Sequence, residues 1–117
     1  IIASAEVVGS IRLASSNVGE LGTVDELRNL AVQLRDQMQN DSAASALFAT
    51  IAGKPMLVVA LTKLAEANGA KAGDLVRLAS SVLGGGGGGK ADIAQGGGSD
   101  VSKIDAAISA IRSELAK

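Results

Sequence analysis

The chain of 117 residues lacks cysteine, histidine, tryptophan and tyrosine, and its one aromatic residue is Phe48. Without cysteine there is no disulfide bond and no thiolate metal site, and without histidine there is no histidine-centred catalysis. A single aromatic ring also excludes the aromatic platforms on which many RNA-binding modules stack bases. Hydrophobic residues make up 47% of the sequence, so the core must be aliphatic.

Charge and hydropathy argue against a broadly basic nucleic-acid-coating protein and against a membrane-spanning one. The formal net charge is −1, which is unsuited to coating nucleic acid by broad electrostatic attraction. Residues 1–53 carry a net charge of −3 and residues 54–117 one of +2, enough for a small phosphate-contacting patch. No apolar run is long enough to span a membrane, and residues 1–8 lack the basic start of a signal peptide. Because the chain does not begin with methionine, we expect residues 1–117 to be one globular domain of a longer cytoplasmic protein.

Two stretches give clear local signals. Thr23 and Glu26 form a capping box, and the apolar residues behind it recur every three or four positions as far as Met38, which predicts a helix. Two aliphatic runs, residues 46–52 and 56–62, flank the breaker triplet Gly-Lys-Pro and predict a β-hairpin. The second run is apolar at nearly every position, so we expect it to be a central strand covered on both faces.

The other expected elements follow from periodicity and breakers. The order β-α-β-β-α-β-α predicts an α/β fold of the α+β sandwich type, with a sheet of about four strands covered by helices. The elements are a strand from Val7 to Leu13, a turn from Asn17 to Gly22, a helical turn from Lys63 to Asn68, a helix from Leu75 to Leu83 ended by Gly84, a strand from Ala91 to Gln95, and a last helix, capped by Ser99 or Asp100, that buries Ile104, Ile108, Ile111 and Leu115.

The most unusual stretch is GGGGGGKADIAQGGG, residues 84–98, which holds nine of the fifteen glycines. A backbone without Cβ atoms can gather N–H groups into a concavity and lets another molecule approach to main-chain contact. A flexible linker is the alternative, but the six residues between the glycine blocks and the helix and strand expected at its ends argue against one. We therefore predict a structured, glycine-rich signature loop that leads from a helix into a strand.

This stretch resembles the glycine-rich signature near the C-terminus of alanyl-tRNA synthetases, G-G-x-G-G-G-[RK]-x-D-x-A-Q-x-G-G. The matching residues are Gly84, Gly85, Gly87, Gly88, Gly89, Lys90, Asp92, Ala94, Gln95, Gly97 and Gly98. The resemblance implies a C-terminal domain of the DHH-associated type called C-Ala. Such a domain contacts the elbow of tRNA and helps deliver one bound tRNA to both the aminoacylation and the editing centres.

The resemblance also implies the partner and the residues that meet it. The partner would be alanine-specific tRNA, and the parent an ATP-dependent alanine–tRNA ligase that can form homo-oligomers. We expect no catalytic residue, metal or cofactor in this segment, because ATP and zinc would bind only in upstream parts of the parent. The expected RNA-binding residues are Gly84, Gly85, Gly86, Gly87, Gly88, Gly89, Lys90, Asp92, Gln95, Gly96, Gly97 and Gly98.

Two catalytic readings of the glycine stretch fail. Residues 84–90 satisfy G-x-x-x-x-G-K, but Ala91 replaces the Ser or Thr that holds Mg²⁺ in a P-loop, and a P-loop leads from a strand into a helix. Some DHH-associated domains accompany phosphoesterases and carry a Gly-Gly-His element, which this chain lacks. Asp92 and Asp100 are better explained by a bond to a glycine N–H and by a helix cap, respectively.

Individual side chains leave alternatives open. Lys90 is either a solvated surface lysine or a phosphate contact, and Gln95 either reads a base edge or ties the loop to the sheet. A different class of function, a protein-interaction or dimerisation module, is supported by the near-neutral charge. Further candidate contacts to the RNA backbone are Lys54, Lys71, Arg77 and Lys103.

Overall fold

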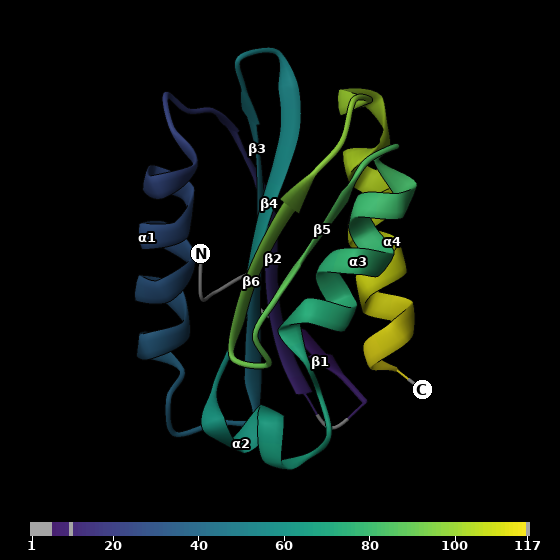
Figure 1. Cartoon of the computed structure of the whole chain (residues 1–117). Helices are drawn as coiled ribbons and strands as arrows, with labels where there is room; N and C mark the ends of the chain where they lie inside the picture. Colours follow the sequence, from purple (N-terminus) through teal and green to yellow (C-terminus); the bar gives the residue numbers. More distant parts are fainter. Residues whose placement is uncertain (1–5, 10, 117) are drawn as a thin grey trace.

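The structure is a computed structural model that describes residues 6–9 and 11–116. A β-sheet forms the middle layer, with α1 on one face, α3 and α4 on the other, and α2 at one end (Figure 1). This arrangement confirms the predicted α/β class. The helices are α1 Val24–Gln37, α2 Lys63–Ala67, α3 Ala72–Val82 and α4 Ile104–Leu115, the last preceded by a short 3₁₀ helix, Val101–Lys103.

Within the described residues the sheet has six strands in the order β1-β2-β3-β4-β6-β5. Only β2 and β3 pair in parallel, and the other neighbouring strands are antiparallel. The strand count therefore exceeds the predicted four. The strands are β1 Glu6–Val8, β2 Ile11–Glu20, β3 Ala43–Ile51, β4 Lys54–Leu61, β5 Gly86–Gly89 and β6 Ile93–Gly97.

Two locally encoded elements form as predicted. The Thr23 hydroxyl accepts a hydrogen bond from the Glu26 N–H at 3.3 Å and starts α1. The predicted hairpin is β3 and β4, which pair up to Ile51 and Lys54 around a two-residue turn. Both turn residues have positive φ, as a type I′ turn requires. β4 is central and almost entirely buried, which confirms the expectation of cover on both faces.

The sheet has an aliphatic core on each face. One core packs between the sheet and α3 and α4, and it includes the buried Phe48. The other lies between the sheet and α1, whose buried stripe is Leu27, Ala31 and Leu34. The buried stripe of α4 is Ile104, Ala107, Ile111 and Leu115, so the predicted stripe is right except that Ala107 is buried and Ile108 only partly so.

The N-terminal prediction of one strand followed by a turn is wrong. Two antiparallel strands, β1 and β2, replace the single strand, with Gly9 at φ +62° between them. β2 then continues through the expected turn to Glu20, because parallel pairing with β3 holds it in the sheet. The turn-forming residues instead produce an irregularity, in which the Asn17 Oδ1 accepts from the Gly19 N–H at 3.1 Å and the register shifts before Glu20.

The glycine stretch is also not the predicted loop. Residues 86–89 form β5, which pairs antiparallel with β6, and β6 runs to Gly97 instead of ending at Gln95. Gly84 does end α3 as predicted, with φ +81° and its N–H bonded to the Ser81 carbonyl. The two glycine blocks therefore lie on and beside the two strands of a hairpin, and residues 85–98 are called the glycine hairpin below.

A serine beneath the glycine hairpin supplies a test of this packing. The Ser80 hydroxyl on α3 is fully buried and has no hydrogen-bond partner among the described residues. Ser80→Ala should raise the free energy of unfolding by about 1 kcal/mol, because it removes an unsatisfied polar group. In contrast, Ser45→Ala should lower it by about 1 kcal/mol, since the buried Ser45 hydroxyl donates to the Ala31 carbonyl at 2.8 Å. Urea titration of both variants measures the difference, and a loss of stability in Ser80→Ala would contradict the buried, unpartnered placement.

The start of α4 supplies a pH-dependent test. Hydrogen bonds from the Ser102 hydroxyl and then the Ser102 N–H lower the pKa of Asp100 below its ordinary value of 3.8. The charged cap therefore adds stability above the unfolded-state pKa, and this contribution disappears as pH falls through the lower folded-state pKa. Relative to Asp100→Asn, which keeps a neutral cap, the melting temperature of the wild type should fall as pH drops below about 4. A melting-temperature difference that does not change with pH would show that the carboxylate is not held in this way.

Candidate nucleic-acid interface

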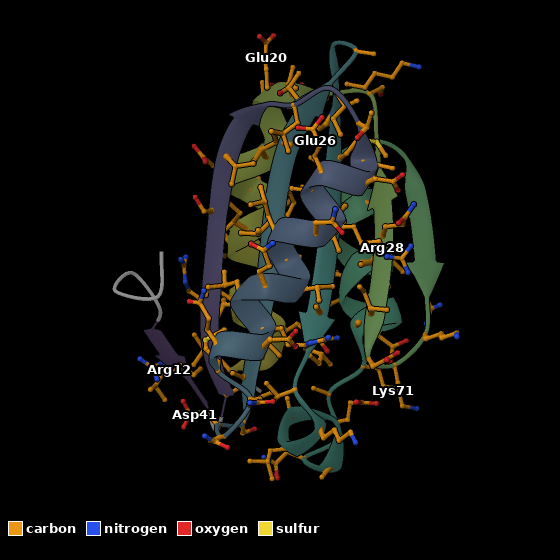
Figure 2. The ribbon with its side chains drawn as sticks, turned by 90° about the vertical axis from the view of Figure 1, so that its left-hand side faces the viewer. Arg12, Glu20, Glu26, Arg28, Asp41 and Lys71 are labelled. Carbon is orange, nitrogen blue, oxygen red and sulfur yellow. The ribbon has the colours of Figure 1, made fainter. Side chains whose placement is uncertain are left out.

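The glycine hairpin lies at one edge of the sheet and has one covered and one uncovered face. α3 packs on the first face at main-chain distance, since a Cβ at Gly73 would come within 2.8 Å of the Gly89 carbonyl oxygen. On the second face α1 packs against β3 and β4, and Figure 2 shows that it leaves the green strands β6 and β5 uncovered.

Six glycines of the hairpin are required by the fold itself. A Cβ added at any of them would come closer than 3.0 Å to atoms of α3, of Leu83 at the end of α3, of the partner strand or of β4. At Gly87, for example, it would meet the Gly96 Cα, the Gln95 carbonyl oxygen and a methyl group of Val76. No bound molecule is needed to explain these glycines, which are Gly85, Gly87, Gly89, Gly96, Gly97 and Gly98.

Gly86 and Gly88 are different. A Cβ added at Gly86 has no other atom within 4 Å, and one at Gly88 has only the side chain of Arg77, at 3.6 Å. Neither residue has the positive φ that disfavours a side chain. Nothing within the described chain therefore requires glycine at these two positions, and together they leave a patch of bare main chain on the hairpin.

Two shallow hollows lie along the hairpin. Their volumes are about 450 and 300 Å³. Gln95 lines both of them. The first is lined by Met56, residues 84–86 and residues 95–99, and the second by Arg28, residues 88–90 and residues 92–95.

Cationic side chains come to the hairpin from three elements. Arg28 reaches across from α1 (Figure 2). Its Nη1 donates to the Gln95 Oε1 at 3.4 Å. Lys90 is exposed beside the second hollow, in the turn between β5 and β6. Arg77, on α3, forms an ion pair with Asp74 and lies beside Gly88.

Sequence reasoning did not find Arg28. It stands 67 positions before Gln95, and only the pairing of β6 with β4 brings the two together. The sequence does show that Arg28 lies next to the buried stripe of α1. That position does not indicate which strand lies beside the helix.

The other predicted cations are spread around the hairpin. Lys71 precedes α3 near the β5–β6 turn, because the next N–H, that of Ala72, donates to the Ala91 carbonyl at 2.9 Å. Lys54 lies at the opposite end, where the Pro55 carbonyl accepts from the Gly98 N–H at 3.1 Å. Lys103 lines neither hollow. The predicted bond from the Asp92 carboxylate to a glycine N–H is not what fixes the turn, where the Asp92 main-chain carbonyl accepts from Leu61 at 2.8 Å.

Residues 6–9 and 11–116 contain no group of three or more acidic, histidine or cysteine residues placed to hold a metal ion. None of their helices has the length and hydropathy needed to cross a membrane.

Comparison with known proteins gives a consistent assignment. The DHHA1 domain family model matches residues 10–117. Alanine–tRNA ligases of Leifsonia xyli subsp. xyli and Bifidobacterium longum are 45% and 48% identical to this chain, over 92% of its length but only 12% of theirs. The crystal structure of the C-Ala domain from Aquifex aeolicus alanyl-tRNA synthetase superposes with a TM-score of 0.87 at 31% identity, covering 97% of this chain and 99% of that one. The chain therefore belongs to the DHHA1 domain family and has the fold of the C-Ala domain of alanyl-tRNA synthetase.

Proposed function

We propose that the uncovered face of the glycine hairpin binds the elbow of alanine-specific tRNA. By holding this part of the tRNA, the domain would help a cytoplasmic alanine–tRNA ligase to present one bound tRNA to both its aminoacylation and its editing centres. In this proposal the domain itself is not catalytic and binds no cofactor, and ATP and zinc are used elsewhere in the parent enzyme.

The observation that supports this proposal is the bare main chain at Gly86 and Gly88, where side chains would fit but are absent. A flat surface without side chains can pack against the exposed face of a base pair at the end of a stacked helix. Lys90 and Arg77 flank the same hairpin and can contact neighbouring phosphates. Because the surface offers no aromatic ring, it should recognise the shape of a folded RNA in preference to unstacked bases.

A fluorescence-anisotropy titration tests the proposal. We expect the 117-residue chain to bind folded tRNA at least about tenfold more tightly than an unstructured RNA of equal length. Two or three phosphate contacts should give a modest salt dependence, with a log–log slope of about −2 to −3. Equal affinity for unstructured RNA, or no binding to folded tRNA, would refute elbow recognition by this surface.

Substitution of Lys90 provides a narrower test of the same surface. Lys90→Ala should weaken tRNA binding several-fold and reduce the magnitude of the salt slope by about one, because it removes a single phosphate contact. Lys103→Ala is the matched control, since Lys103 is exposed but lines neither hollow. If both variants bind tRNA like the wild type, Lys90 does not belong to the interface.

Self-association is a second candidate function, favoured by the free edge of β5. Lys90 donates its N–H to the Ile93 carbonyl, so alternation along an antiparallel pair turns the main-chain groups of Gly87 and Gly89 away from β6. Such an edge can pair with the same strand of a second copy. Sedimentation velocity distinguishes this alternative, since a dimer would grow with protein concentration and persist at high salt.

A further inference from the structure

The two hollows on the glycine hairpin share one lining residue, the polar Gln95. Its neighbours on β6, Ala94 and Gly96, are buried, in keeping with the alternation of a strand. Gln95 is instead half-buried and turned towards α1, where it meets Arg28. A molecule that occupies both hollows would therefore contact Gln95.

The contact with Arg28 determines which end of this amide is available. A guanidinium group has only hydrogen-bond donors, so Arg28 can bond to the Gln95 oxygen but not to the amide N–H groups. The amide nitrogen therefore points away from Arg28. Within residues 6–9 and 11–116, no acceptor takes a hydrogen bond from that nitrogen. The amide therefore presents two N–H donors at the residue that the two hollows share.

We infer that Arg28 is a positioning residue, which orients Gln95 so that its amide NH₂ donates a hydrogen bond to an acceptor on the bound RNA. The inference rests on the proposed function and adds the recognised chemistry. A ribose 2′-hydroxyl or an acceptor atom on a base edge has the required character. A phosphate is matched better by a cation such as Lys90, whereas the Gln95 amide is neutral and suits a neutral acceptor.

Four variants test the inference by binding to folded, in vitro transcribed alanine tRNA. Gln95→Ala should weaken binding about tenfold, and Arg28→Ala should cause a similar loss, because the amide is no longer held. The double variant should lose no more than either single variant. Gln95→Glu keeps a partner for Arg28 but has no donor, so its loss should be at least as large as that of Gln95→Ala.

The salt dependence separates positioning from a direct phosphate contact. Arg28→Ala should leave the slope of log affinity against log salt unchanged, whereas removal of a phosphate contact would reduce its magnitude by about one. Matched controls are Arg12→Ala, which removes an arginine paired with Asp41, and Gln33→Ala, which removes an exposed amide of α1. Both controls should bind tRNA like the wild type.

A second set of tRNAs distinguishes the two sources of the acceptor. In these, the elbow nucleotides carry 2′-deoxyribose. If a 2′-hydroxyl is the acceptor, deoxy tRNA should bind the wild type about tenfold more weakly and Gln95→Ala should cause no further loss. If a base edge is the acceptor, the deoxy change should have no effect and the loss in Gln95→Ala should remain complete. Either result supports the donor role of Gln95.

Other results would overturn the inference, and they would show whether the proposed function or only the role of Gln95 is wrong. If the wild-type chain does not bind folded tRNA, the proposed function is wrong and the inference falls with it. If the wild type binds but Gln95→Ala and Gln95→Glu do so equally well, only the donor role is wrong. If the losses in Arg28→Ala and Gln95→Ala add together and the salt slope changes with Arg28, the two residues contact the RNA independently.

Discussion

Gly87→Ala should lower the free energy of unfolding by about 3 kcal/mol, whereas Gly86→Ala, one position earlier, should raise it by about 0.5 kcal/mol. At Gly87 the new methyl group would come closer than 3.0 Å to main-chain atoms of β6 and to Val76 on α3, and neither can withdraw without separating the hairpin from its neighbours. At Gly86 the methyl group enters open space, and the substitution reduces the conformational freedom of the unfolded chain.

Urea denaturation of the two variants measures this contrast directly. They share the same chemical change, the same strand and nearly the same exposure, so propensity effects cancel between them. Equal stability of the two variants would mean that β5 is not packed against α3 and β6 as described.

Gly86→Val combined with Gly88→Val should weaken binding of folded tRNA about a hundredfold while leaving the free energy of unfolding within about 1 kcal/mol of the wild type. The added side chains would stand on the bare main chain and prevent a base pair from reaching contact distance. The glycines themselves can accept side chains, since only the flexible Arg77 lies near either position. Anisotropy titration with tRNA and urea denaturation of the same samples give the two quantities.

Ala106→Val provides a matched control, because it enlarges an exposed residue of α4, on the other side of the sheet. It should leave tRNA affinity unchanged. Wild-type affinity in the double glycine variant would exclude close approach to this surface as the basis of binding. Substitution of Gly87 cannot replace this experiment, because the loss of folding would be mistaken for a loss of binding.

The parts of the fold that could be predicted are those whose signals lie close together in the sequence. The capping box of α1 spans four residues, and the β3–β4 hairpin is announced by its own turn. β5 could not be predicted, because glycine has a low propensity for strands and favours loops. It becomes a strand through pairing with β6 and through close packing against Gly73 and Val76 of α3, contacts that strand propensity does not describe.

The candidate site follows the same division. The unusual composition of residues 84–98 indicated the segment of the candidate site, but nothing in the sequence distinguishes one of its glycines from another. Only the packing separates the six that the fold requires from Gly86 and Gly88, which it does not. The pairing of Arg28 with Gln95 likewise depends on the order of strands in the sheet, which local patterns do not encode.

The packing of α3 against the glycine hairpin also bears on the kinetics of binding. For each residue that becomes ordered, glycine loses more conformational entropy than any other amino acid. Here the contacts with α3, β4 and β6 fix the hairpin when the chain folds, so this entropy is already lost before a ligand arrives. Association should then proceed without a slow ordering step, and substitutions on the uncovered face should change chiefly the rate at which the complex dissociates.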